Sequence, residues 1–138
     1  ITREGINLEH MISDKAYYSP TSDKIHLPLL EQFKNINEYY STAFHEATHS
    51  TMTKDRCDRK QEIKLLEFSS EDYSKEELVA EMGSAFIMNS LGLETARTFK
   101  NSTAYIQSWI KVLRNDVKFV VSASSKAEKA VKYILNEK

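Results

Sequence analysis

Cysteine, glycine and proline are all scarce in this chain, whose 138 residues include one cysteine, three glycines and two prolines. The single cysteine, Cys57, excludes an intrachain disulfide framework and agrees with a cytoplasmic location, where thiols stay reduced. Glycine and proline are the residues that most often interrupt helices. Their scarcity therefore favours a chain that is mostly helical, with few loops.

Charge of one sign is not in excess either, because 19 Lys and Arg residues stand against 20 Asp and Glu residues. This balance argues against a domain drawn to nucleic acid or to an anionic membrane. No apolar run approaches the roughly 20 residues that a membrane helix needs, and the first residues lack the apolar stretch of a secretory signal. Because no initiator methionine is present, we expect residues 1–138 to be a single domain of a longer protein.

The pattern of apolar residues predicts a small sheet and four helices. Residues 16–28 predict two short antiparallel strands with Pro20 and Asp23 in the turn between them, whereas the first 16 residues have no clear period. Asn37 is the expected N-cap of the first helix and Asp116 that of the fourth. Helices are expected over residues 38–52, over 74–91, from 102 and from 117, with a surface connection over 54–70. These elements predict an α+β fold, mostly helical, with a small antiparallel sheet near the N-terminus.

The first predicted helix carries the motif His45-Glu46-Ala47-Thr48-His49. Residues four apart lie on the same helix face, so the rings of His45 and His49 can meet on one metal ion. Glu46 leans towards the same cleft, where a carboxylate can take a proton from a metal-bound water. A catalytic zinc also needs a third protein ligand and an open position. Imidazole and carboxylate ligands favour Zn²⁺, although they can also hold other divalent metals.

The second predicted helix offers the third ligand. Glu77 and Glu81 are also four apart, and the small residues Ala80 and Ser84 allow another helix to come close. One carboxylate can bind the metal while the other orients a ligand histidine. We assign Glu77 as the ligand and Glu81 as the supporting carboxylate. The assignment of Glu81 as the ligand stays open, because residues 74–77 also fit a capping box in which Glu77 reaches back to the start of its own helix.

Together these residues predict the hydrolysis of a peptide bond by a zinc-activated water. Zinc lowers the pKa of its water towards about 7, Glu46 takes the proton as general base, and zinc holds the developing oxyanion. Tyr73, which we place on the loop entering the Glu77 helix, is the candidate for a further donor to the oxyanion. We expect a zinc-dependent metallopeptidase with a protein or peptide substrate and no membrane partner.

The alternative is a scaffold that keeps the metal but acts as a non-catalytic protein-binding module. The presence of Glu46 favours catalysis, because a purely structural zinc site has no need of an acid beside its ligand.

Further segments accompany the motif in a fixed order from about residue 16 to residue 135. They are Tyr17-Tyr18-Ser19-Pro20 with Asp23, Tyr39-Tyr40, the segment Tyr73 to Glu81, Ala104-Tyr105-Ile106 with Ser108-Trp109, and Ala127 to Leu135. With the His45 to His49 motif, they resemble the zincin-like metallopeptidase domain at the C-terminal end of ArdC-type antirestriction proteins of conjugative elements. Ala47 departs from that pattern, in which a large aliphatic residue is common after the motif's Glu.

The resemblance implies a zincin fold, with a small sheet over the active-site helix and a Glu-bearing helix below it. It implies a gluzincin-like site in which Glu77 binds zinc and Glu81 supports a histidine. It also implies that this chain is a C-terminal part of a longer protein. Because ArdC-type proteins typically carry an N-terminal domain for single-stranded DNA, DNA binding and an antirestriction role would depend on a domain absent from this chain.

Overall fold

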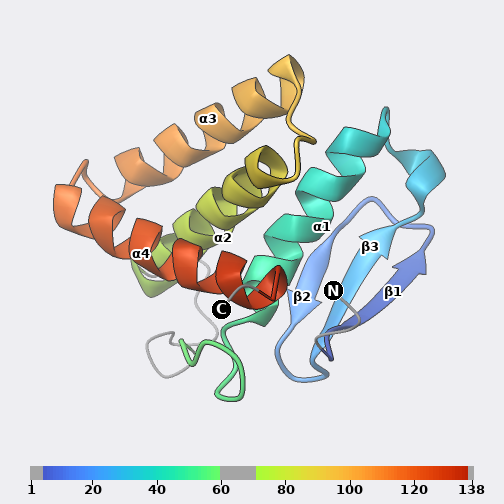
Figure 1. Cartoon of the computed structure of the whole chain (residues 1–138), viewed down its shortest axis with the longest axis horizontal. Helices are drawn as coiled ribbons and strands as arrows, with labels where there is room; N and C mark the ends of the chain where they lie inside the picture. Colours follow the sequence, from blue (N-terminus) through green and yellow to red (C-terminus); the bar gives the residue numbers. More distant parts are fainter. Residues whose placement is uncertain (1–4, 60–70, 137–138) are drawn as a thin grey trace.

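The computed structural model describes residues 5–59 and 71–136, which contain four helices and a three-stranded sheet. This confirms the predicted α+β class, mostly helical with a small sheet near the N-terminus (Figure 1). No helix in the described part is long and apolar enough to cross a membrane. The elements are β1 (Asn7–Met11), β2 (Tyr17–Ser19), β3 (Lys24–Pro28), a 3-10 turn (Leu30–Gln32), α1 (Ile36–Ser50), α2 (Glu71–Ser90), α3 (Ala96–Val112) and α4 (Val117–Ile134).

The N-cap of helix α1 lies two residues before its predicted position. Asn35, and not Asn37, is the N-cap, because its side-chain oxygen accepts the backbone amide of Glu38 at 3.0 Å. Asn37 instead donates its side-chain amide to the carbonyl of Leu93 at 2.7 Å, which ties α1 to the segment after α2. Asparagine is a favoured N-cap residue and both asparagines lie at the start of the predicted helix, so the sequence pattern alone could not distinguish them.

Two other helices also begin earlier than predicted, because their first turns are polar and carry no apolar period. The first turn of α2 holds exposed or half-buried acids, which the positive end of a helix dipole favours. The first turns of α3 are mostly exposed, apart from the buried Thr98, which forms a capping box with Thr95. Helix α2 begins at Glu71, where Ser74 was predicted, and α3 begins at Ala96, where Ser102 was predicted. Helix α4 begins at Val117, after the N-cap Asp116, as predicted.

The predicted antiparallel pair of strands is β2 with β3, and β1 joins the other edge of β3 in parallel. The sheet is therefore mixed and has one strand more than the sequence predicted. Strand β1 has no apolar alternation, because of its five residues only Leu8 is packed against the core and the others are exposed. In β3, by contrast, Ile25 and Leu27 are fully buried on one face.

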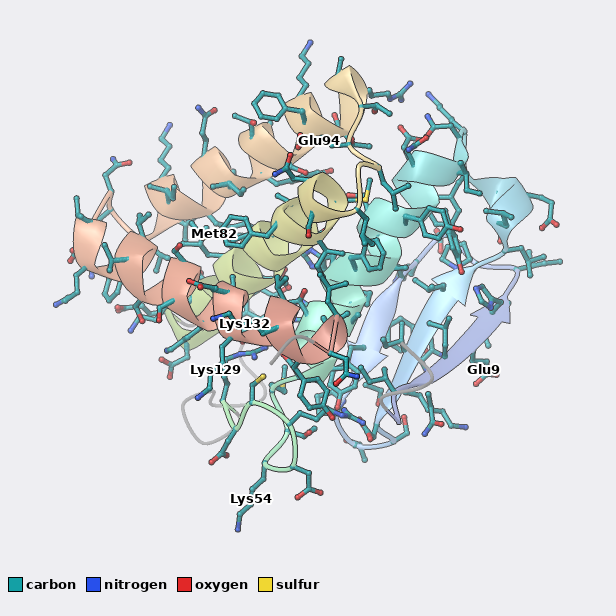
Figure 2. All side chains as sticks on the ribbon, in the orientation of Figure 1. Glu9, Lys54, Met82, Glu94, Lys129 and Lys132 are labelled. Atoms are coloured by element: carbon teal, nitrogen blue, oxygen red, sulfur yellow. The ribbon has the colours of Figure 1, made fainter. Side chains whose placement is uncertain are left out.

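Helix α1 lies between the sheet and α2, and α3 and α4 pack against α2 (Figure 1). One core cluster joins the sheet, α1 and the C-terminal ends of α2 and α4, and a second joins α2, α3 and α4. Met82 of α2, labelled in Figure 2, belongs to the second cluster. Helices α1 and α2 approach closely at Gly83, where a Cβ atom would lie 2.6 Å from Oγ1 of Thr48. Close by, the hydroxyl of Ser84 donates to the carbonyl of Ser41 at 2.7 Å.

The segment after α1 is only in part the surface connection that the sequence predicted. Lys54 is exposed at the tip of its loop (Figure 2). Arg56, however, forms two hydrogen bonds of 2.8 Å with the carboxylate of Asp23 and another of 2.8 Å with the carbonyl of Ser50. Arg59 is buried, with 4% of its surface exposed. The rest of the predicted connection, residues 60–70, lies outside the described residues.

Candidate metal centre

Helix α1 presents the two histidines of the motif at its contact with α2. The ring centroids of His45 and His49 are 4.8 Å apart, and the ring planes meet edge to face at 80°. Only 17% and 11% of the two side chains are exposed. Their i, i+4 spacing thus places both rings over one point on the neighbouring helix.

Glu77 of α2 occupies that point and offers one carboxylate oxygen to each ring. Its Oε2 lies 3.2 Å from Nε2 of His45, and its Oε1 lies 3.3 Å from Nε2 of His49. Ligand atoms of the three residues lie within 4.8 Å of one another. A tetrahedral zinc site with metal–ligand distances of roughly 2.0–2.1 Å has ligand atoms about 3.3 Å apart. The two imidazoles and the carboxylate therefore fit a divalent cation.

Each histidine is held on its other ring nitrogen by a second carboxylate. Nδ1 of His45 lies 3.1 Å from Oε1 of Glu81, and Nδ1 of His49 lies 2.8 Å from Oε2 of Glu76. Such partners fix the orientation of a ligand imidazole. Glu81 was considered for this position, but Glu76 was missed. The sequence did contain a signal for Glu76. Two ligand histidines each need a supporting carboxylate, and Glu76 lies directly before Glu77.

Glu76 is itself held by Arg59, which sequence reasoning also missed. Nε and Nη2 of Arg59 donate to Oε1 and Oε2 of Glu76 at 2.9 and 3.0 Å. The same guanidinium donates to the carbonyl of Thr48 at 2.8 Å and to the hydroxyl of Thr51 at 2.7 Å. Arg59 belongs to a run of charged residues that resembles a solvated loop, so the sequence contained no signal for its burial.

Ser74 lies inside α2, so the alternative in which Glu77 caps its own helix is wrong. The helix begins at Glu71, and Ser74 is buried with 4% of its surface exposed. The carboxylate of Glu77 faces the two histidines. Glu81 reaches His45 at Nδ1, whereas Glu77 reaches it at Nε2, so the two carboxylates lie at different atoms of the same ring.

Burial and hydrogen bonding shift the pKa values of these residues. Burial alone would lower the pKa of His45, but its hydrogen bonds to Glu77 and Glu81 outweigh this and raise the pKa to about 9. Burial would likewise lower the pKa of His49, which its bonds to Glu76 and Glu77 raise well above the usual value. Burial would raise the pKa of Glu77, and the two histidines hold it far below its usual range. A cation that binds here therefore takes the place of protons.

Glu46 is buried beside this cluster and faces a cavity. Its Oε2 lies 4.0 Å from Nε2 of His45, and 8% of the residue is exposed. Burial raises the pKa of its carboxyl group. Both residues line a cavity of about 350 Å³ between α1, α2 and α3, together with Glu81, Asn101 and Tyr105. The cavity therefore borders the centre at His45, Glu46 and Glu81.

Tyr73 lies in the first turn of α2, and not on a loop before it as the sequence predicted. Its ring packs edge-on against Trp109 of α3, with centroids 5.9 Å apart. The pKa of Tyr73 is raised to about 12, chiefly by burial and further by the charge of Glu77 and a hydrogen bond to it. Its hydroxyl is therefore protonated at neutral pH and lies at the Glu77 side of the centre as a donor.

Comparisons with known proteins identify the family of this fold and centre. Residues 1–126 match the zincin-like metallopeptidase family, and the chain belongs to that family. It is similar to the antirestriction protein ArdC of plasmid R388 in its Mn(II)-bound structure, with a TM-score of 0.77 and 34% identity over 99% of this chain and 49% of that one. The metal-free structure of ArdC gives a TM-score of 0.74 and 35% identity, over 99% and 47% of the two chains.

The curated relatives are much longer than this chain. A DNA primase TraC of Escherichia coli is 37% identical over 135 residues, which are 98% of this chain and 12% of the relative. The uncharacterized protein y4eC of Sinorhizobium fredii is 34% identical over 124 residues, which are 90% of this chain and 39% of the relative. The chain therefore spans less than half the length of either relative, and the similarity concerns only that part of each.

Proposed function

We propose that this chain is the catalytic domain of a zinc-dependent metallopeptidase that hydrolyses a protein or peptide substrate. His45, His49 and Glu77 hold the metal, and Glu46 is the general base. The position of Glu46 is the observation that supports this proposal most, because a buried carboxylate lies beside a ligand histidine and on the wall of a cavity. A site that only held the fold together would have no need of it.

The residues around the metal then have defined tasks. When bound, a divalent cation lowers the pKa of a water molecule and polarises the scissile carbonyl. Glu46 accepts a proton from the attacking water and returns it to the leaving amine, and its raised pKa brings it closer to the range in which it can do both. Tyr73, kept protonated by its raised pKa, donates a hydrogen bond to the developing oxyanion. Glu76 and Glu81 keep the two imidazole rings in place.

We further propose that the domain is the C-terminal part of a longer cytoplasmic protein of a mobile element, which acts against host restriction. The similarity to the ArdC antirestriction protein of plasmid R388 supports this role. Contact with single-stranded DNA would then belong to regions outside this chain, whose own net charge is -1. The substrate that the domain would cut in this setting is a protein or a peptide.

Elemental analysis and a hydrolysis assay on the wild type and Glu46→Gln test the proposed function. We expect about one zinc per chain in both proteins. Cleavage of fluorescein-labelled casein, or of a random peptide library, should fall about 10²- to 10⁴-fold in Glu46→Gln. Zinc is distinguished from other divalent metals, such as the Mn(II) in the ArdC structure, by the same elemental analysis.

Three results would contradict parts of this proposal. Equal cleavage by the wild type and Glu46→Gln would exclude Glu46 as the base. Full metal content without cleavage of either probe would favour the non-catalytic protein-binding module. Absence of any divalent metal, even after its addition to the purified protein, would exclude the metal centre itself.

A further inference from the structure

We propose that Arg59 is a positioning residue for the metal centre, because its guanidinium fixes the carboxylate of Glu76 and Glu76 fixes the ring of His49. The inference rests on the proposed function only in taking His49 as a metal ligand. In the part of the chain that the structure describes, Arg59 has no hydrogen bond to His45, His49 or Glu77, so it would act on the centre indirectly, through Glu76 and through the backbone beside His49.

The contact between Arg59 and Glu76 is a fork that fixes the plane of the carboxylate. Nε and Nη2 reach one carboxylate oxygen each, at 2.9 and 3.0 Å. The oxygen that Nη2 holds, Oε2, is also the one that lies 2.8 Å from Nδ1 of His49. Two parallel hydrogen bonds from a planar guanidinium resist rotation of the carboxylate, which a single ammonium group cannot do. The position of the Oε2 atom, and with it the imidazole ring, is therefore determined by Arg59.

Arg59 also holds the backbone beside the same histidine. Nη2 donates to the carbonyl of Thr48, the residue before His49, at 2.8 Å, and Nη1 donates to the hydroxyl of Thr51 at 2.7 Å. The last turn of α1 and the ring of His49 are thus fixed by one side chain. A displacement of that side chain would move the ligand atom both through its backbone and through its ring partner.

The burial of Glu76 explains why the partner is an arginine. Glu76 is 6% exposed and Arg59 4% exposed, so the carboxylate has little access to water. A buried carboxylate that keeps its charge is stabilised by a positive partner and by hydrogen bonds. Burial would raise the pKa of Glu76, but the hydrogen bond to His49 and the charge and hydrogen bonds of Arg59 lower it below its usual value. The equivalent carboxylate on the other histidine, Glu81, is 14% exposed in its side chain and has no Lys or Arg within ion-pair distance among the described residues. Arg59 therefore gives the His49 side of the centre a further set of hydrogen bonds.

Arg56 provides a matched control on the same segment. It also forms a forked pair with a carboxylate, that of Asp23, and also donates to a carbonyl near the end of α1, that of Ser50. It makes no hydrogen bond to a residue of the metal centre. Loss of Arg56 should therefore reproduce the effect of losing a buried arginine on stability without moving His49.

Binding of Co²⁺ to the metal-free protein tests this inference with a readout that does not depend on activity. The affinity for Co²⁺ is measured by competition with a chelator, and the visible spectrum of the Co²⁺ form reports the geometry of its ligands. We expect Arg59→Met to bind Co²⁺ about 10- to 100-fold more weakly, with a changed spectrum. Arg56→Met should keep the Co²⁺ affinity and the spectrum of the wild type, even if its melting temperature falls by as much as that of Arg59→Met. Arg59→Lys keeps the charge but not the forked pair of hydrogen bonds. It should therefore also bind Co²⁺ more weakly than the wild type and show a change of the spectrum in the same direction.

The double variant Arg59→Met with Glu76→Gln separates positioning from general damage. It removes both buried charges and leaves an amide oxygen that can accept from Nδ1 of His49, so part of the lost affinity should return. If Arg59→Met does not fold, the Co²⁺ affinity and the spectrum of Arg59→Lys and of the double variant test the inference instead. Wild-type affinity and spectrum in the folded Arg59 variants would overturn the inference. Failure of the wild type to bind Co²⁺ or Zn²⁺ would instead overturn the metal centre, and the inference with it.

Discussion

At the scale of single residues, Glu76 and Glu77 are consecutive in the chain but hold opposite sides of one imidazole ring. Glu77 faces Nε2 of His49, and Glu76 faces Nδ1. Successive side chains on a helix point about 100° apart, so two neighbours can enclose a ring that lies across the helix. The ring of His49 cannot rotate without losing at least one of these contacts. In the proposed role of His49 as a metal ligand, these contacts would hold its ring in place before the ion binds.

The two carboxylates near His45 should differ in their effect on the metal. Glu77→Ala removes a ligand and should abolish zinc binding, whereas Glu81→Ala only frees the ring of His45 and should weaken binding about 10- to 100-fold. Zinc content by elemental analysis and affinity by chelator competition measure both effects. Glu71→Ala, at an exposed acid in the first turn of the same helix, is the control and should bind zinc normally. Zinc kept by Glu77→Ala and lost by Glu81→Ala would make Glu81 the ligand.

Spacing along a helix could be predicted from the sequence, whereas the contact between Arg59 and Glu76 could not. The pairs His45 with His49 and Glu77 with Glu81 follow from the helical repeat alone. Arg59 meets Glu76 only because the segment after α1 folds back against α2, and no local pattern encodes that return. Its neighbours in the sequence are charged, which made burial at this position unexpected.

At the scale of elements, the crossing of α1 and α2 sets the distance between the histidines and Glu77. The two helices come close at Gly83, where a Cβ atom would meet Thr48, which is fully buried and precedes His49. Thr48 has little freedom to move, since its hydroxyl donates to the carbonyl of Phe44 at 2.8 Å. A side chain at position 83 would therefore push the two helices apart beside the centre.

Gly83→Ala should destabilise the domain although alanine is the better helix former. The new Cβ would lie 2.6 Å from Oγ1 and 2.7 Å from Cγ2 of Thr48, and overpacking of this kind costs about 1–3 kcal/mol, against a gain of roughly 1 kcal/mol in helix propensity. Urea unfolding should show a net loss of about 1 kcal/mol, and the zinc affinity should fall.

Two further variants check the cause of that loss. Asn89→Ala, at an exposed position of the same helix, should have no such effect. The double variant with Thr48→Ala, which removes both close atoms, should recover much of the loss caused by Gly83→Ala. Wild-type stability and affinity in Gly83→Ala would mean that the crossing is not tight.

Elements with an apolar stripe were predicted, and those without one were not. Helices α1, α2 and α4 and the β2–β3 pair have buried apolar residues, such as Ile25 and Leu27 in β3, and α3 has a partly buried apolar face. Strand β1 buries little more than Leu8, so its pairing with β3 rests on backbone hydrogen bonds that leave no periodic signal. The first turns of α2 and α3 likewise carry no apolar period, and the sequence pattern therefore placed the starts of these two helices too late.

At the scale of the whole molecule, α2 connects two core clusters, and the metal centre lies at its contact with α1. The order in which helices pack does not follow from helical periodicity, and only the resemblance to zincin domains indicated it. The segment that follows α1 adds a link of its own, because Arg56 binds the turn of the sheet at Asp23 while Arg59 binds Glu76. These two arginines therefore link the sheet, α1 and α2 around the centre.

Metal binding should therefore raise the melting temperature of the entire domain, and more so at pH 8 than at pH 6. A metal at about 1,000 times its dissociation constant contributes roughly 4 kcal/mol, which corresponds to a shift on the order of 10 °C in a domain of this size. The pKa of His45 rises to about 9 in the metal-free fold, above its unfolded value of about 6.5. Its ion pairs therefore stabilise the metal-free form fully below that unfolded value and lose this effect as the pH rises through the folded one.

The metal, by contrast, competes with fewer protons as the pH rises. Calorimetric scans with and without a chelator at the two pH values measure the difference. His49→Ala should show no shift at either pH. An equal shift at both pH values, or a larger one at pH 6, would mean that metal binding does not displace protons from the histidines.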